Sequence, residues 1–114
     1  MDYTQIDDYL EQHLAQSIAE LSALIAQPSV CAEKDGVEEC AQLLHHMLLK
    51  RGFKAEIHQT TGAPILTAER KGSSEKTVLI YNHYDVQPAD PLELWETQPF
   101  EPVIRDGKLF GRGS

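Results

Sequence analysis

The chain has 114 residues, a length that suits one domain or part of one. Hydrophobic residues make up 41% of it, which is enough for a packed core and excludes wholesale disorder. Its 18 acidic and 10 basic residues give a formal charge of −8, which argues against nucleic acid as a partner, because phosphates are recognised by clustered Lys and Arg. No apolar run approaches the roughly 20 residues that a membrane-spanning helix needs, so we expect no membrane partner either.

The two cysteines indicate the cellular compartment. Cys31 and Cys40 match no metal-binding or redox spacing, and we expect two reduced thiols rather than a disulfide. The N-terminus lacks a basic region followed by an apolar core, so no signal peptide is visible. We therefore expect a cytoplasmic protein.

Two helices are predicted in the first half of the chain. The first extends from Thr4 to Gln27 and is stopped by Pro28. Its apolar residues recur at helical spacing and predict one buried stripe: Ile6, Tyr9, Leu10, Leu14, Ile18, Leu21, Leu24 and Ile25. The second helix is predicted from about Gly36 to Arg51, and Gly52 is a natural residue to follow its end.

Strands are predicted after the helices. Alternating residues at 53–57 indicate a half-buried strand, and 65–70 a second one, close enough for antiparallel pairing. The most apolar segment, 77–82, is predicted to be a third and central strand. A long proline-containing loop at 85–102 follows, and then a hairpin around Asp106-Gly107. These elements predict an α/β fold with two N-terminal helices packed on a mixed sheet.

The strongest candidate site lies directly after the predicted central strand. In open α/β sheets, ligands bind beyond the carboxyl ends of the strands, which is where His83 and Asp85 stand. Imidazole is a good Zn²⁺ ligand, and a nearby carboxylate orients such a ligand or a metal-bound water. The alternatives are a strand-end histidine with no ligand role and an aspartate that only caps the loop.

Three motifs occur together in the C-terminal part of the chain. They are Tyr-Asn-His-Tyr-Asp-Val-Gln-Pro at 81–88, Trp-Glu-Thr-Gln-Pro-Phe at 95–100, and Asp-Gly-Lys-Leu-Phe-Gly-Arg-Gly-Ser at 106–114. In sequence, order and spacing this set closely resembles the M20 family of zinc metallopeptidases, in the branch of cytosolic dipeptidases and carnosinase-like enzymes. The helix pair around Gln27-Pro28-Ser29-Val30 is similar too, so the resemblance covers essentially the whole chain.

The resemblance implies a catalytic domain with two Zn²⁺ ions per site, Mn²⁺ or Co²⁺ being alternatives, and a small peptide or N-acyl amino acid as substrate. It assigns metal binding to His83 and a supporting catalytic role to Asp85. It also implies a homodimeric complete protein, and further ligands, a general base and a lid domain beyond Ser114. Residues 1–114 are thus expected to be the N-terminal portion of a zinc-exopeptidase-like catalytic domain. A lone imidazole cannot hold a catalytic zinc, so we expect the chain by itself to be inactive.

Other readings of the same residues stay open. The chain as a whole is alternatively a non-enzymatic α/β domain that binds a partner or a metal weakly. Trp95 and Phe100 are expected to anchor the long loop against the sheet, the alternative being a substrate contact. Gly111 and Gly113 are expected to permit a close backbone approach, and Arg112 either pairs with an internal carboxylate or is exposed.

Overall fold

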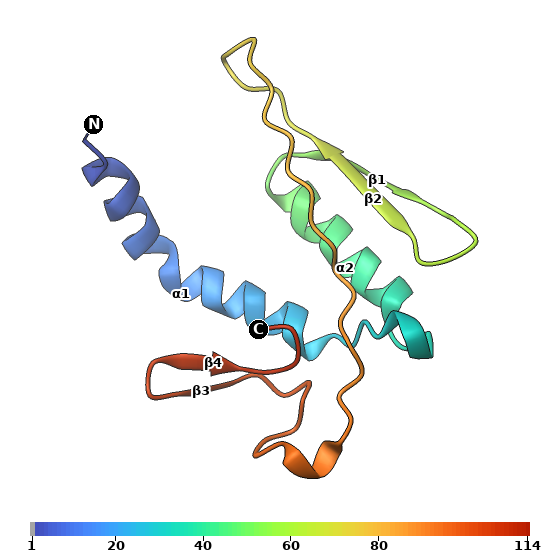
Figure 1. The fold of residues 1–114 in the computed structure, drawn as a ribbon. Helices are drawn as coiled ribbons and strands as arrows, with labels where there is room; N and C mark the ends of the chain where they lie inside the picture. The colour runs from blue at the N-terminus through green and yellow to red at the C-terminus, as the bar shows by residue number, and fades with distance from the viewer. Residues whose placement is uncertain (1) are drawn as a thin grey trace.

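The computed structural model describes residues 2–114, and Figure 1 shows their arrangement. Two α-helices are followed by two short antiparallel hairpins, so the fold is α/β as predicted. The elements in chain order are α1 (Thr4–Ala26), η1 (Cys31–Glu33), α2 (Val37–Lys50), β1 (Lys54–His58), β2 (Ile65–Glu69), η2 (Leu92–Leu94), β3 (Val103–Arg105) and β4 (Lys108–Phe110).

Helix α1 has nearly the predicted bounds, but its apolar stripe is not buried. The Asp2 carboxylate accepts a hydrogen bond from the backbone N–H of Thr4, which supplies a partner to a free donor at the start of the helix. At the other end the backbone becomes extended at Gln27, before Pro28. Along the helix Ile25 is buried, whereas the apolar residues of the N-terminal half are more than half exposed. The expectation of one buried stripe is therefore wrong for the described residues.

Helix α2 and the first hairpin form the best-packed unit. The helix begins after Gly36, whose φ of +67° is left-handed, and Gly52 follows its end with a φ of +77°. β1 and β2 pair antiparallel, as predicted, and the structure sets the register, with Ala55 opposite Ala68 and Ile57 opposite Leu66. α2 packs on both of these strands, whereas α1 meets α2 over a small contact and diverges from the hairpin (Figure 1). Of the two predicted helices, α2 is the one that covers a sheet.

The predicted central strand at 77–82 is not formed. This segment has no strand pairing, and Val78, Leu79, Ile80 and Tyr81 are 77–90% exposed. A strand is stabilised by hydrogen bonds to a neighbour, and none of the described strands pairs with this segment. The sheets in the described part are both antiparallel and two-stranded, so the expected mixed sheet is absent from residues 2–114.

The last predicted element, the hairpin around Asp106-Gly107, is confirmed. β3 and β4 pair antiparallel, and both turn residues have positive φ, +49° and +72°, as a two-residue turn of this kind requires. The hairpin lies beside the C-terminal half of α1 (Figure 1).

The molecule is open in shape. Its radius of gyration is 16.5 Å, against about 13 Å for a compact domain of roughly 100 residues. The buried apolar residues among 2–114 are few and gather where α1, the following loop and α2 meet: Ile25, Val30, Val37, Cys40 and Ala41. No helix among residues 2–114 is both long enough and apolar enough to cross a membrane.

Candidate metal-binding site

His83 and Asp85 form a hydrogen-bonded pair on the surface. The Nδ1 atom of His83 lies 3.1 Å from Oδ1 of Asp85 and 3.0 Å from the backbone carbonyl oxygen of the same residue. The imidazole is 78% exposed, so it is not enclosed in apolar packing. The side chain is therefore accessible to a ligand from solvent.

The contacts of Nδ1 define the tautomer of the neutral imidazole. Both partners of Nδ1 are oxygen acceptors, so this nitrogen must carry the hydrogen and donate it. The Nε2 atom then carries the free lone pair. A carboxylate that fixes the tautomer in this way is the usual partner of a metal-binding histidine, because it orients the ring and increases its basicity.

The third sequence motif packs against the first. Gly113 has a φ of +87°, and a Cβ added there would lie 2.6 Å from Cγ1 of Val86. Gly111 has no room for a Cβ either, because the side chain of Ile25 occupies that position. The expected close approach at both glycines is thus present, and it places this motif next to the end of α1 and one residue from Asp85.

The second motif is joined to the other two through its tryptophan. Trp95 donates its indole N–H to the carbonyl of Ala89 at 2.8 Å, and the Arg112 guanidinium lies 4.9 Å from the ring centroid. The backbone N–H of Arg112 donates to the carbonyl of Pro99 at 2.7 Å. Trp95 thus joins two parts of the loop to each other and to the segment that follows β4. Arg112 pairs with no carboxylate of residues 2–114 and stacks on the tryptophan instead.

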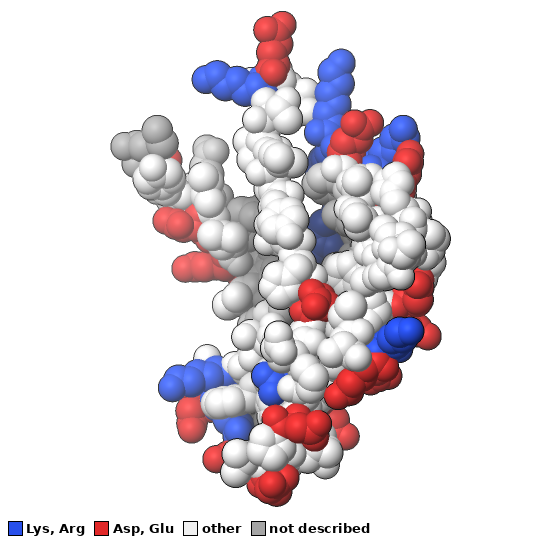
Figure 2. Space-filling view, turned by 45° about the vertical axis from the view of Figure 1, so that its right-hand side comes forward, with Lys and Arg blue, Asp and Glu red and all other residues white. Residues whose placement is uncertain are grey.

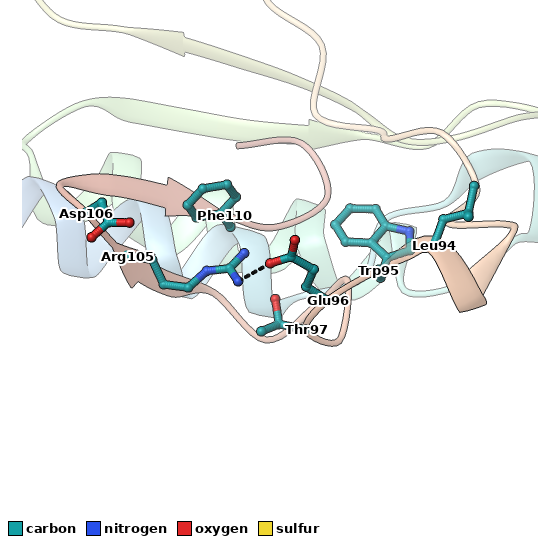
Figure 3. Close-up of a pocket in the computed structure, with 7 residues that line it drawn as sticks. All are labelled: Leu94, Trp95, Glu96, Thr97, Arg105, Asp106 and Phe110. Atoms are coloured by element: carbon teal, nitrogen blue, oxygen red, sulfur yellow. Dashed lines mark hydrogen bonds and ion pairs between the residues drawn. The ribbon is translucent and has the colours of Figure 1, made fainter.

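An open pocket of about 390 Å³ lies between η2 and the β3–β4 hairpin (Figure 3). Trp95 and Phe110 form part of its wall, and an ion pair between Arg105 and Glu96 lies across it. Neither His83 nor Asp85 lines this pocket. The candidate metal ligand therefore lies outside this pocket.

The described residues supply one metal ligand but not a complete set of ligands. His83 offers a free imidazole nitrogen with the right support, but no group of three or more His, Cys, Asp or Glu residues within 2–114 could surround an ion. A catalytic zinc usually has three protein ligands and a water. No catalytic step can therefore be derived from these residues alone.

Two contributors to this region were not singled out from the sequence. Ser29 and Tyr84 hold the backbone around Asp85 through hydrogen bonds that bridge 55 and 20 residues of chain. Both residues lie in stretches that carry the family resemblance, but their roles were not predicted, because those roles depend on which segments meet in space.

Comparison with known proteins extends these observations. The family model "Peptidase family M20/M25/M40" matches residues 79–114, which contain all three motifs. The succinyl-diaminopimelate desuccinylase of Azoarcus sp. (strain BH72) is 42% identical over 91 residues, covering 80% of this chain and 23% of the relative. The desuccinylase of Paraburkholderia xenovorans (strain LB400) is 36% identical over 104 residues, covering 89% and 27%. The chain thus spans about a quarter of the length of these relatives.

Solved structures agree with this result. An M20 family metallo-carboxypeptidase from Sulfolobus solfataricus superposes with a TM-score of 0.81 at 38% identity, over 84% of this chain and 22% of that one. The dipeptidase Dug1p from Saccharomyces cerevisiae gives 0.83 at 28% identity, over 98% and 27%. The proteins that this chain resembles are named as a peptidase family, a desuccinylase, a metallo-carboxypeptidase and a dipeptidase. Residues 79–114 thus match the M20 family, whose members generally use divalent metal ions, and most of the chain resembles the N-terminal part of solved or curated members.

Proposed function

We propose that residues 1–114 are the N-terminal portion of the catalytic domain of a metal-dependent hydrolase that cleaves dipeptides or related N-acyl amino acids. The observation that carries the proposal is the His83–Asp85 pair, with its exposed imidazole and its Nδ1 atom held by two oxygen acceptors. The motif that contains this pair lies within the region matched by the family model. The relatives named dipeptidase and desuccinylase define the range of substrates to be tested.

In this proposal each residue has a limited role. Asp85 keeps the hydrogen of the imidazole on Nδ1, and His83 offers Nε2 as one ligand to a divalent cation, Zn²⁺ in the first instance, with Mn²⁺ or Co²⁺ as alternatives. A pair of such ions, when bound, would acidify a water and stabilise the charge that develops on the cleaved amide. The other ligands and the general base come from outside residues 1–114, and the chain by itself is inactive.

The proposal extends to the setting of the enzyme. By its resemblance to the dipeptidase branch, the complete enzyme is a cytoplasmic homodimer with a small peptide substrate. The −8 charge and the mixed acidic and basic groups of the face in Figure 2 give no support to a nucleic acid as substrate.

Calorimetric titration with Zn²⁺ is the first test, and it uses the 114-residue chain. One imidazole supported by one carboxylate should give only weak binding, with no stoichiometric site of sub-micromolar dissociation constant. A tight site in the chain that His83→Ala abolishes would contradict the proposal of an incomplete ligand set and would favour the alternative of a self-contained metal-binding module.

The second test uses the complete enzyme of which this chain is proposed to be a part. His83→Ala should remove most hydrolysis of a panel of dipeptides and N-succinyl amino acids, because losing only the hydrogen-bond partner of a metal ligand already costs roughly 10- to 100-fold. His58→Ala is the matched control, because that imidazole is bonded to Thr67 on the β1–β2 hairpin and is expected to leave the activity unchanged. Equal activity of the two variants would overturn the ligand assignment.

A further inference from the structure

Ser29 is a buried polar residue that contacts both sides of Asp85. It is 3% exposed and lies in the loop between α1 and η1. Its Oγ donates to the carbonyl oxygen of Tyr84 at 2.8 Å, and its own carbonyl accepts the backbone N–H of Val86 at 3.0 Å. One residue therefore holds the backbone immediately before and immediately after Asp85.

The loop that carries Ser29 is itself firmly held. Val30 and Asp35 exchange two backbone hydrogen bonds, of 2.9 and 3.2 Å, which close the loop into a bridge. Gly36 packs so closely on the carbonyl of Pro28 that a Cβ has no room there. On the other side of Ser29, Val30 is 2% exposed and belongs to the core. Ser29 is thus fixed on a rigid support, as a residue that orients others must be.

The segment that Ser29 holds has little other support. Residues 77–82 have no strand partner, and the backbone reaches His83 from this exposed stretch. Within residues 2–114, four hydrogen bonds join 83–89 to other parts of the chain. Two are those of Ser29, one runs from the Tyr84 hydroxyl to Pro64, and one from Trp95 to Ala89. Ser29 makes the two that lie nearest to Asp85.

We infer that Ser29 is a positioning residue for the His83–Asp85 pair. Its hydroxyl fixes the peptide between Tyr84 and Asp85, so that both the carboxylate and the carbonyl of Asp85 stay directed at Nδ1 of His83. The catalytic part of this inference rests on the proposed function. The two hydrogen bonds of Ser29, in contrast, are present in the chain without metal.

The experiment for the metal-free chain measures hydrogen exchange at the Val86 amide. Ser29→Ala removes the bond to Tyr84 and should lower the protection of Val86 about five- to tenfold, as expected for losing one buried hydrogen bond. Val37→Ala is the control, since Val37 is in the same core at 7% exposure but is not bonded to residues 84–86. After scaling by each variant's global stability, Val37→Ala should leave Val86 unchanged. Equal loss of protection in both variants would overturn the inference.

A second readout separates positioning from general stability. In the complete enzyme loaded with Co²⁺, Ser29→Ala should weaken Co²⁺ binding about tenfold and alter the visible absorption of the bound ion, whereas Val37→Ala should do neither. An unchanged spectrum and affinity in Ser29→Ala would refute the positioning role. If His83→Ala itself left Co²⁺ binding intact, the proposed function would fail. Hydrogen exchange at Val86 would still show whether Ser29 holds the backbone around Asp85.

A conservative variant covers the case in which Ser29→Ala does not fold. Ser29→Cys keeps the size of the side chain but replaces a strong hydrogen-bond donor by a weak one. It should give an intermediate loss of protection at Val86. Full wild-type protection in a folded Ser29→Cys chain would show that the hydroxyl bond is not needed and would overturn the inference.

Discussion

Gly113 and Val86 are in contact at a point where a single added methyl group cannot be accommodated. The Cβ of any other residue at 113 would lie 2.6 Å from Cγ1 of Val86, and the φ of +87° is unfavourable for a residue with a side chain. This contact joins the C-terminal motif to the backbone next to Asp85. It explains why glycine is needed at position 113 for packing.

Gly113→Ala is therefore expected to destabilise the chain by about 1–3 kcal/mol, combining backbone strain with an overpacked contact. Urea denaturation followed by circular dichroism measures the change. Gly72→Ala is the control and should change stability by less than about 0.5 kcal/mol, because nothing lies within 4 Å of a Cβ at that position. Adding Val86→Ala to Gly113→Ala should restore the part of the stability that is lost to the steric contact. If the double variant is no more stable than Gly113→Ala, the contact is not the cause of the loss.

The tautomer of His83 provides a test of its bond to Asp85. In the wild-type chain, ¹⁵N NMR at a pH where the ring is neutral should show the hydrogen on Nδ1, because two oxygens accept from it. Asp85→Ala removes the carboxylate and should shift the ring toward a mixture of tautomers. His13, whose Nδ1 lies 2.7 Å from the carbonyl of Tyr9, serves as an internal control and should not change. A wild-type His83 with its hydrogen on Nε2 would contradict the described pair.

The two thiols should differ in reactivity. Cys31 is exposed, whereas Cys40 is buried, and burial raises the pKa of the Cys40 thiol, an effect that hydrogen bonding with Ser29 partly opposes. At pH 8 a thiol reagent should label Cys31 rapidly and Cys40 at least tenfold more slowly, as mass spectrometry of digested protein would show. Labelling at equal rates in the folded chain would contradict the buried position of Cys40.

The same shift has a defined effect on stability. Because the pKa of Cys40 is higher in the folded state, the folded chain retains a proton that the unfolded chain releases once the pH passes the usual thiol value of about 8.5. The contribution of the protonated Cys40 thiol to the free energy of unfolding is therefore fully present below that pH. It is lost as the pH rises through the folded-state pKa of this thiol. Unfolding free energies of wild type and Cys40→Ala, measured from pH 7 to 10, should converge in the alkaline range. A gap that widens above pH 8.5 would contradict the sign of the shift.

The exposed apolar segment Val78–Tyr81 should make the isolated chain bind hydrophobic dyes and self-associate. Leu79 is 90% exposed, and an uncharged band extends through the middle of the face in Figure 2. Unpaired apolar segments of this kind bind hydrophobic dyes and associate with one another. Leu79→Lys should lower the binding of anilinonaphthalene sulfonate and the self-association seen by sedimentation velocity, with stability unchanged within about 0.5 kcal/mol.

Ile57→Lys is the contrasting variant for this experiment. Ile57 is half-buried in β1, which packs on α2, so a lysine there should destabilise the fold measurably. If Leu79→Lys destabilised the chain as much as Ile57→Lys, Leu79 would have to be packed in solution.

The local elements and the resemblance to a family could be inferred from the sequence alone. The bounds of both helices, the pairing of β1 with β2 and the Asp106-Gly107 turn follow from periodicity, from Pro28 and from glycines with left-handed backbone, all of which act within a few residues. His83 and Asp85 could likewise be proposed as a pair, since they stand two residues apart. The spacing of the three motifs sufficed for the resemblance to the M20 family.

Only the tertiary structure decided which of these elements are covered and what holds the site. The apolar composition of 77–82 predicted a buried strand, but a strand needs a neighbour to share its hydrogen bonds, and composition does not supply one. Three contacts join residues far apart in the chain: the hydrogen bond of Ser29 to Tyr84, the packing of Gly113 on Val86 and the stacking of Arg112 on Trp95. Such contacts depend on how segments meet in space, so no pattern along the chain encodes them, and they fix the surroundings of Asp85.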